Sequence, residues 1–584
     1  MLKDCLEVFK KKLDENGDKY IIDSYIPADG TYIIVEPKND SYEIREVIDI
    51  KLDKKTKEIN QKGNSNFEKI CTYDYTSKLI DMNKPIDGKK IIHSNNYLSF
   101  FIKKESLTNK KLTDEIIDNY YAVLSNPSVK YSKSKNATKI YESIEEEIGK
   151  VDINTLEKIK NWIKEKIFNL NIDVTGKDYL KIFFEYPTEY YKREGKRYLI
   201  PNIYNSNDFN IIVEGDIYGL PNDNMGLNSK KPYLENKTRK ITVPYLADNS
   251  EVLLQKKLFD YLMNLAAIGK VNIYIDSDNN EIRGYENGKL PDKDFNGIFL
   301  RLKKGKEVEI HDYDIITSYK HNLFKKFKFK NILQIDQSSK NVSIQKYGEW
   351  GKVEDVQQIL NEVFFSKFLI TNYFTEPGDL SINDGSLKNN LLLSRETLFN
   401  WIYKGVDNCV FPVLNKVSLS LVKGSIENGY IQKASHQFNL RWSLINYFKV
   451  GKDMADIMYD LKKSLRVKIN SNITDKLDND KEYYFAVGQL VGYLLSRSKG
   501  KNKPHSLANS FINGKNNDDI KERLRKLYSK YSYDPDINGK RFNNLYAMII
   551  GYVPEGKVNQ DLIVGGYLNN NLIYESNKEE KVNG

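Results

Sequence analysis

Short runs of alternating or β-branched apolar residues predict strands in the first 350 positions, and amphipathic stretches between them predict helices. No strict strand–helix–strand alternation and no repeat of fixed period accompanies these runs, so the pattern favours an α+β fold. The predicted strands lie at residues 32–37, 42–52, 209–221 and 271–277. The two clearest predicted helices lie at residues 156–170 and 251–267, where apolar side chains recur at helical spacing.

Beyond residue 351 the alternating pattern nearly disappears and helical periodicity continues to the end of the chain. Asp480 and Asn517 are the predicted N-caps of two of these helices. The resulting prediction is an α+β N-terminal part (1–350), a helical middle region (351–452) and a C-terminal helical bundle (453–584). The predicted helices cover residues 353–374, 395–405, 428–448 and 454–469, then EYYFAVGQLVGYLLSRSK, DDIKERLRKLYSKY, RFNNLYAMIIGY and DLIVGGYLNNNLIY.

Composition narrows the class of protein. The 584 residues are 40% hydrophobic and 29% charged, which is typical of a globular chain with sizeable cores. No apolar run reaches the roughly 18–20 residues of a membrane helix, and the first residues carry acids and lysines where a signal peptide is apolar. The three cysteines are far apart and form no CxxC pair. We therefore expect a cytoplasmic protein without membrane contact, disulfides or a cysteine zinc site.

Positive charge is concentrated in the last quarter of the chain. The net charge of the chain is +10. Residues 454–584 carry 21 Lys and Arg against 16 Asp and Glu, a net charge of +5, which is half of the total. A mild excess by itself leaves nucleic acid, an acidic partner and chance all open. Its distribution favours an acidic partner for the tail.

Sequence motifs for catalysis are missing. No Gly-Lys pair is followed by Ser or Thr, and no GxSxG, HExxH or kinase motif set occurs, so neither a P-loop nor a common hydrolase is predicted. The five histidines are scattered. The His311–Asp312 pair lacks the companion ligands that a metal phosphohydrolase needs, and we interpret it as a polar turn. We expect a non-catalytic binding protein with no cofactor and no metal.

Residues 320–330, KHNLFKKFKFK, interleave lysine with phenylalanine. In an extended strand this alternation places aromatic rings on one face and ammonium groups on the other, where lysines can meet phosphates while phenylalanines anchor the strand or stack on bases. Lys325, Lys326 and Lys328 are therefore candidate nucleic-acid contacts. The alternative is an edge strand whose lysines merely prevent aggregation.

Two further basic stretches, residues 130–139 and 188–201, are predicted as loops that either contact nucleic acid or are simply solvated.

The most unusual segment covers residues 218–240, a long polar stretch that follows a predicted strand. Its asparagine amides can read base edges or sugar hydroxyls, and its lysines can bind phosphate. Long ordered loops in compact domains are usually functional. The candidate contacts are Asn222, Asn224, Asn228, Lys230 and Lys231.

At this point the sequence resembles a known family. NMGLNSKKPYLENKTRK resembles the signature segment of the large subunit of type I-B CRISPR surveillance complexes (Cascade, Csh-type). YYFAVGQLVGYLLSRSK, PHSLANSFIN, RFNNLYAMIIGY and VGGYLNNNLIYES are similar to the helical domain of that subunit, in the same order. Together the similar segments cover about a third of the chain.

The resemblance implies a non-catalytic role in antiviral defence. The large subunit binds the 5′-handle end of the CRISPR RNA, recognises the protospacer-adjacent motif on double-stranded target DNA and offers a docking surface to a helicase-nuclease, while guide pairing reads the sequence. Its implied partners also include the Cascade backbone subunits and the small subunit. Some relatives carry a cysteine-rich zinc element that this chain lacks.

The resemblance also bears on the basic tail. In type I-B systems the small subunit can be made by internal initiation, and Met454 is a candidate start here. Tail residues that could hold single-stranded backbone are Arg497, Lys499, Arg523 and Lys526. Two other interpretations remain open: a metal-dependent nuclease of unknown type, and a structural protein of a mobile element.

Overall fold

The computed structural model describes residues 2–39, 41–80, 83–204, 209–221, 246–335, 347–449, 453–500, 503–534, 537 and 539–575. Residue contacts divide the chain into two compact units. The first unit is Met1–Asn287 with Asn296–Ile315, and the second is Gly288–Phe295 with Ile316–Gly584. This division differs from the predicted boundaries near residues 350 and 452.

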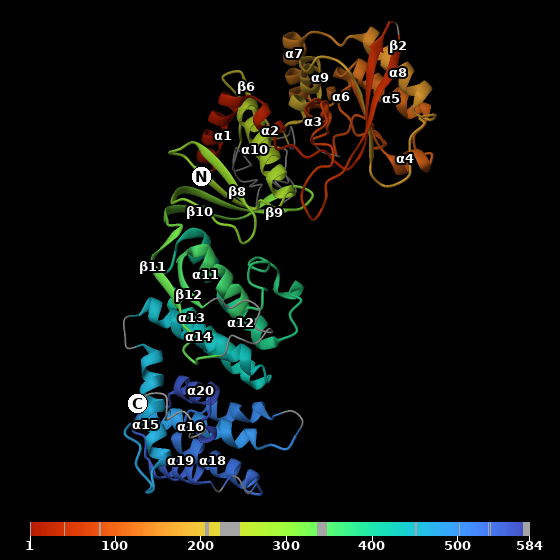
Figure 1. The fold of residues 1–584 in the computed structure, drawn as a ribbon. Helices are drawn as coiled ribbons and strands as arrows, with labels where there is room; N and C mark the ends of the chain where they lie inside the picture. Colours follow the sequence, from red (N-terminus) through yellow and green to blue (C-terminus); the bar gives the residue numbers. More distant parts are fainter. Residues whose placement is uncertain are drawn as a thin grey trace. The chain divides into compact units, whose positions relative to one another are not determined.

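The predicted fold class is confirmed: an α+β N-terminal part precedes an all-helical C-terminal part (Figure 1). Among the described residues the last strand is β12 (Gly348–Lys352). In the described part of the chain, no helix combines the length and the apolar character needed to cross a membrane.

The first sheet of unit 1 has the strand order β2-β1-β4-β3. β1 pairs antiparallel with β2 and parallel with β4, and β3 pairs antiparallel with β4. The middle strands β1 and β4 are buried along nearly their whole length, and helices α3, α5, α8 and α9 contribute side chains to the same core. The strands are β1 (Gly30–Lys38), β2 (Ser41–Ile50), β3 (Ser99–Lys103) and β4 (Tyr179–Phe184). The helices are α3 (Phe67–Ser77), α5 (Asp114–Ser125), α8 (Ile153–Lys166) and α9 (Thr188–Leu199).

A buried ion pair joins α3 to β4 within this core. The Asp74 carboxylate lies 2.5 Å from the Lys181 ammonium, and both side chains are almost fully removed from solvent. Tyr25 donates a hydrogen bond of 3.1 Å to Asp74. The Lys181 nitrogen lies 4.8 Å from the centre of the Phe101 ring. Burial lowers the pKa of Lys181, although the Asp74 charge opposes that effect.

The second sheet of unit 1 has the order β10-β9-β7-β8, and helices α1 and α10 pack against it (Figure 1). Cys5, Phe9 and Leu262 are among the buried side chains of this core. The strands are β7 (Asn272–Asp276), β8 (Glu281–Tyr285), β9 (Phe295–Lys304) and β10 (Val308–Tyr319). The helices are α1 (Leu2–Asn16), α2 (Lys19–Ile22) and α10 (Asn249–Ala267), and α10 is capped by the Asp248 side chain.

Three predictions for unit 1 are wrong. Residues 209–221 form a hairpin of two short strands, β5 (Ile211–Val213) and β6 (Asp216–Tyr218), because Glu214 and Gly215 adopt left-handed backbone angles and turn the chain. The two predicted basic loops are helical: residues 130–139 contribute to α6 (Ser128–Tyr131) and α7 (Lys135–Ile148), and residues 188–201 contain α9. The remaining short helix is α4 (Lys104–Thr108).

Unit 2 begins with the two-stranded sheet of β11 (Asn322–Phe329) and β12, which pair antiparallel with a bulge between Asn322 and Phe327. A layer of helices follows: α11 (Val353–Ile359), α12 (Gly385–Lys404), α13 (Val410–Glu427) and α14 (Ile431–Phe448). The helix predicted for residues 353–374 is shorter than expected, because α11 passes into a π-helical turn at Leu360–Phe364 and Phe365 leaves the helical conformation.

The C-terminal bundle consists of α15 (Met454–Asn470), α16 (Asp480–Ser496), α17 (Asn509–Ile512), α18 (Asn517–Tyr531), α19 (Lys540–Gly551) and α20 (Gln560–Leu568). Each predicted N-cap lies one residue too late, because Asn479 caps α16 and Asn516 caps α18 through their side chains. The bundle shares one apolar core with α13 and α14, through Val422 and Phe438 among others.

Helices α16 and α20 approach each other at glycines. A Cβ atom added at Gly488 would lie 2.1 Å from the carbonyl oxygen of Ile563, and one at Gly566 would lie 2.1 Å from that of Phe485. The contact is reinforced by Gln489, whose amide donates to the Gly566 carbonyl at 2.5 Å. Close packing of the two helices accounts for glycine at these positions.

Candidate nucleic-acid interface

The asparagine- and lysine-rich candidates Asn222, Asn224, Asn228, Lys230 and Lys231 lie outside the described residues. The other candidates belong to unit 2, where they occupy two places, β11 and the C-terminal bundle.

Strand β11 has one buried and one exposed face from Lys326 onward, as the alternation predicts. Phe327 and Phe329 are buried beside α14, whereas Lys326, Lys328 and Lys330 are exposed. The backbone amide of Lys330 donates to the Ser443 hydroxyl of α14 at 3.0 Å. The apolar half of the pattern therefore anchors the strand to a helix, and the basic half faces solvent.

Phe324 departs from this arrangement. Its side chain is 76% exposed, and its ring lies 5.3 Å from that of Tyr447 on α14. The Lys325 ammonium lies 5.3 Å from the Phe324 ring centre and 5.1 Å from the Tyr447 ring centre, so it sits against two aromatic rings. Burial raises the pKa of Tyr447 to about 12, so its hydroxyl stays neutral. We call Phe324, Lys325, Lys326 and Tyr447 the β11 surface.

The lysines of β11 differ in how they are paired. Lys328 forms an ion pair of 2.9 Å with Glu349 on β12, and the hydrogen bond from this lysine lowers the pKa of Glu349. Lys330 pairs with Asp453. Within the described residues neither Lys325 nor Lys326 forms an ion pair: Lys325 lies against two rings, and Lys326 affects Glu349 through its charge, which contributes to the lowered pKa of that carboxyl. Lys325 and Lys326 are thus the two β11 lysines whose ammonium groups no carboxylate contacts directly.

A balanced charge cluster precedes β11. Lys320 pairs with Asp294 at 2.8 Å, and the His321 ring nitrogen lies 2.9 Å from the same carboxylate. The hydrogen bond from Lys320, followed by the one from His321, lowers the pKa of Asp294 to about 2. This carboxylate is therefore ionised at neutral pH and offsets the positive charge on that side of the strand.

The tail candidates lie in two places: Arg497 and Lys499 at and after the C-terminal end of α16, and Arg523 and Lys526 in the interior of α18. Arg497 forms a bidentate ion pair with Asp534 (2.8 and 3.0 Å), and Arg523 donates to the Ser510 carbonyl at 2.6 Å. Lys526 is exposed and lies 3.6 Å from Glu522, one turn away. Lys499 is exposed, and its ammonium lies 4.9 Å from the centre of the half-exposed Tyr533 ring. Of these four, Lys499 resembles Lys325 in combining a cation with an accessible aromatic ring.

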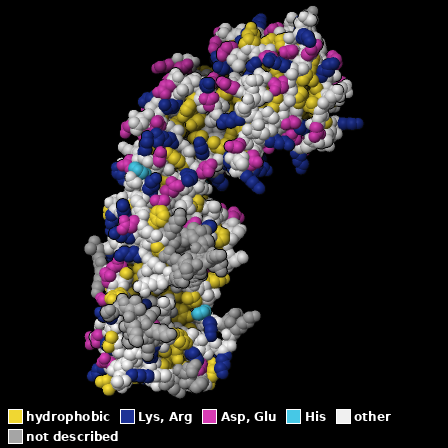
Figure 2. All heavy atoms as spheres, viewed as in Figure 1, with side chains coloured by type: hydrophobic (Ala, Val, Ile, Leu, Met, Phe, Trp, Pro, Cys, Tyr) yellow, Lys and Arg dark blue, Asp and Glu magenta, His cyan; other side chains and the backbone are white. Residues whose placement is uncertain are grey.

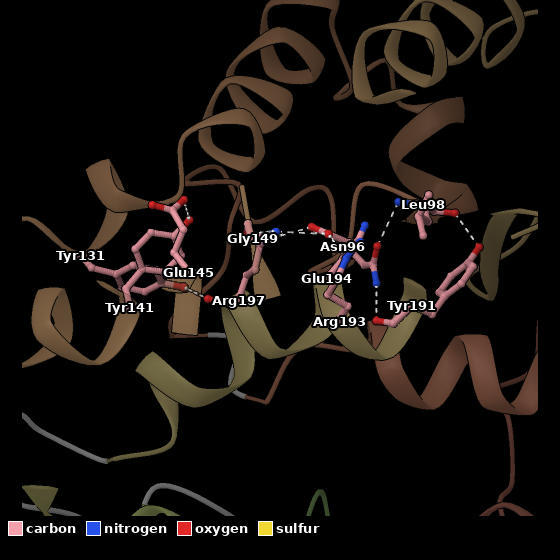
Figure 3. A network of polar contacts seen from close by, with 10 residues as sticks. All are labelled: Asn96, Leu98, Tyr131, Tyr141, Glu145, Gly149, Tyr191, Arg193, Glu194 and Arg197. Atoms are coloured by element: carbon pink, nitrogen blue, oxygen red, sulfur yellow. Dashed lines mark hydrogen bonds and ion pairs between the residues drawn. The ribbon is translucent and has the colours of Figure 1, made fainter. Parts of the chain in front are cut away.

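The basic residues of α9 form a structural network (Figure 3). Arg197 donates to Glu194 at 2.7 Å and to the Gly149 carbonyl at 2.7 Å, and both side chains are buried. Arg193 also pairs with Glu194, and Lys196 pairs with Glu147. These cations bind carboxylates of unit 1, which corrects the interpretation of residues 188–201 as a basic loop.

No group of three or more His, Cys, Asp or Glu side chains is arranged to hold a metal ion among the residues that the structure describes. His311 and Asp312 lie within strand β10, not in a turn as predicted.

Charge by itself does not mark out an interface. Figure 2 shows Lys and Arg side chains interspersed with Asp and Glu over the visible face. The β11 surface combines an exposed aromatic ring with two lysines that form no ion pair, whereas Lys499 and Tyr533 in the tail provide one lysine and one half-exposed ring. The alternation of lysine and phenylalanine predicts the lysines of this surface but not Tyr447, which lies 120 positions beyond Phe327 and shows only the apolar spacing of a helix.

Comparison of the chain with protein-family models, with curated protein sequences and with solved structures finds no match in any of the three.

Proposed function

We propose that this protein binds single-stranded nucleic acid through the β11 surface and acts without catalysing a reaction itself. The observation that carries the proposal is Phe324, a large aromatic ring that is 76% exposed and flanked by Lys325 and Lys326. An exposed ring offers a stacking platform for a base, and adjacent lysines bind the phosphates on either side.

The alternative, a strand whose lysines only prevent edge pairing, explains less. Such a strand is expected to expose charges and bury its aromatic rings, as β11 does at Phe327 and Phe329. An exposed Phe324 ring forgoes the free energy that its burial would provide, and it does not help to prevent aggregation. A binding role accounts for that exposure.

The wider role that we propose is the large subunit of an RNA-guided DNA-surveillance complex, with a guide RNA and target DNA as ligands. Its support is the similarity of the segments at residues 224–240 and 483–576 to the type I-B Cascade large subunit. In such complexes pairing reads the sequence, and the protein holds the backbone and reads a short motif.

Substitution of the exposed ring tests the β11 surface. We expect Phe324→Ala to weaken binding of a short single-stranded oligonucleotide about tenfold, since stacking of one base contributes roughly 1–3 kcal/mol. Fluorescence anisotropy with the full chain measures this. Tyr459→Ala is the matched control, because Tyr459 is 63% exposed on α15. Equal affinities of wild type and Phe324→Ala would contradict the stacking role.

The two unpaired lysines are tested by salt dependence. We expect Lys325→Gln/Lys326→Gln to weaken binding to every sequence and to lower the slope of log affinity against log salt by about 0.7 for each phosphate that is no longer neutralised. Unchanged slopes would show that these lysines do not meet phosphates.

The guide-RNA role is tested by the RNA that copurifies with the tagged protein from its host. We expect short RNAs with one constant 5′ handle and variable spacers. A background of ribosomal fragments would contradict this role without affecting the oligonucleotide tests of the β11 surface.

A further inference from the structure

Unit 1 contains a cavity of about 530 Å³ that the β11 surface does not involve. It is lined by the segment before β1 (Ile26, Pro27, Ala28 and Asp29), the turn after β2 (Leu52, Lys54 and Lys57), the last turns of α10 (Met263, Asn264 and Ala267) and Lys304 at the end of β9. A volume of this size falls in the range of small-molecule sites, roughly 300–1,000 Å³.

The cavity carries an excess of positive charge. Lys54 and Lys57 line it from the turn after β2, and Lys304 lines it from the end of β9. None of the three ammonium groups forms an ion pair in the described part of the chain, although the charge of Lys57 contributes to the lowered pKa of Asp53. The one carboxylate in the lining is Asp29, which accepts the backbone N–H of Leu52 at 3.0 Å. By contrast, the larger cavity between α1 and α10, of about 750 Å³, has four lysines and four carboxylates in its lining. The smaller cavity therefore favours an anion, and the larger one does not.

The rest of the lining is apolar apart from one amide. Pro27, Met263 and Ala267 provide carbon surface, to which a flat ring can be transferred from water with a gain in free energy. The Asn264 amide nitrogen donates to the Ser24 hydroxyl at 3.3 Å, which orients the side chain. Its carbonyl oxygen accepts no hydrogen bond from the described residues and can take one from a ligand.

We propose that this cavity binds one nucleotide whose base carries an exocyclic amino group. The phosphate lies at Lys54, Lys57 and Lys304, the base lies against the apolar wall, and its amino group donates to the Asn264 oxygen. An anion, a flat ring and a hydrogen-bond donor are the three features that the lining selects. The nucleotide is either a free mononucleotide or one unit of a bound strand; the second case rests on the proposed function.

Equilibrium dialysis of the full chain with radiolabelled AMP tests the first case. We expect saturable binding, weaker binding of IMP, which lacks the amino group, and weaker binding of inorganic phosphate. The triple variant Lys54→Gln/Lys57→Gln/Lys304→Gln should weaken AMP binding about tenfold or more, because it removes the charge-assisted hydrogen bonds to phosphate. The matched control is Lys89→Gln/Lys110→Gln/Lys111→Gln, which removes three exposed lysines of unit 1 outside the cavity.

A second variant tests the cavity without changing the net charge of the protein. Ala267→Leu adds carbon atoms to the apolar wall and leaves all three lysines in place. We expect it to weaken AMP binding and to leave phosphate binding unchanged. Equal binding of AMP and inorganic phosphate by the wild type would reduce the cavity to an anion site and overturn the assignment of a nucleotide.

The strand case is tested with the oligonucleotide used for the β11 surface. Failure of AMP to bind, together with weaker strand binding by the triple lysine variant and not by its control, would place one unit of the strand in the cavity. No AMP binding and no difference between these two variants on the strand would overturn the inference. Loss of strand binding on Phe324→Ala would then still support the proposed function, so the two can fail separately.

Discussion

Asp74→Asn is expected to destabilise unit 1 by about 3–5 kcal/mol, because it leaves the Lys181 ammonium buried without its counter-charge. Asparagine keeps the shape of the side chain and can still accept the Tyr25 hydrogen bond, so the loss is electrostatic. The effect should appear as faster hydrogen–deuterium exchange in peptides from α3 and β4 of the full chain, and as an earlier unfolding transition in urea.

Removal of both charges separates the ion pair from the packing around it. We expect Asp74→Leu/Lys181→Met to recover most of the stability lost in Asp74→Asn, since an apolar pair of similar volume avoids the desolvation of two ions. The matched control is Asp118→Asn, which breaks the partly exposed pairs with Lys164 (2.8 Å) and Lys160 (3.4 Å) and should cost less than about 1 kcal/mol. If Asp74→Asn lost as little stability as Asp118→Asn, other groups would have to stabilise the buried Lys181 charge.

Gly488→Ala is expected to destabilise the C-terminal bundle by about 3 kcal/mol. The added methyl group would meet backbone atoms of α20, the Ile563 oxygen at 2.1 Å and the Tyr567 nitrogen at 2.7 Å. Backbone cannot rotate away, so the two helices must separate, which strains the hydrogen bond from Gln489 to the Gly566 carbonyl. Thermal unfolding and hydrogen exchange of peptides from α16 and α20 measure the change.

Gly492 provides the control one turn further along the same helix. A Cβ atom there would meet nothing closer than 3.5 Å, an ordinary van der Waals distance. Gly492→Ala should therefore be neutral or stabilise the bundle by up to about 1 kcal/mol through helix propensity. Similar effects of the two substitutions would contradict the close backbone approach at Gly488.

The spacing of apolar residues predicts secondary structure well where one periodicity continues over many residues. The helices of the tail were found because their apolar residues recur at helical spacing over many turns, and both errors at N-caps were of one residue. The lysines and arginines of residues 130–139 and 188–201 predict loops, with or without a nucleic-acid contact, and the prediction of loops is wrong. Their apolar residues, such as Tyr191 and Tyr198, instead form a buried helix face.

The sequence predicts only the part of the candidate interface that depends on neighbouring residues. The alternation of Phe327, Lys328 and Phe329 is local, and the strand follows it. The pairing of Lys328 with Glu349 and the contact of Lys325 with Tyr447 join residues far apart in the chain. Sequence spacing therefore could not show which lysines remain free to meet a phosphate.

By itself, then, the sequence determined the α+β and all-helical halves and the two-faced strand β11, because helical and strand periodicity are properties of neighbouring residues. Only the tertiary structure decided that Asp74 meets Lys181, 107 positions away, and that Lys304 lines one cavity together with Lys54 and Lys57, which lie far from Lys304 in the chain. The physical reason is that charges and cavities depend on distance in space. A side chain's partner, and hence its availability for a ligand, is set when distant segments pack together.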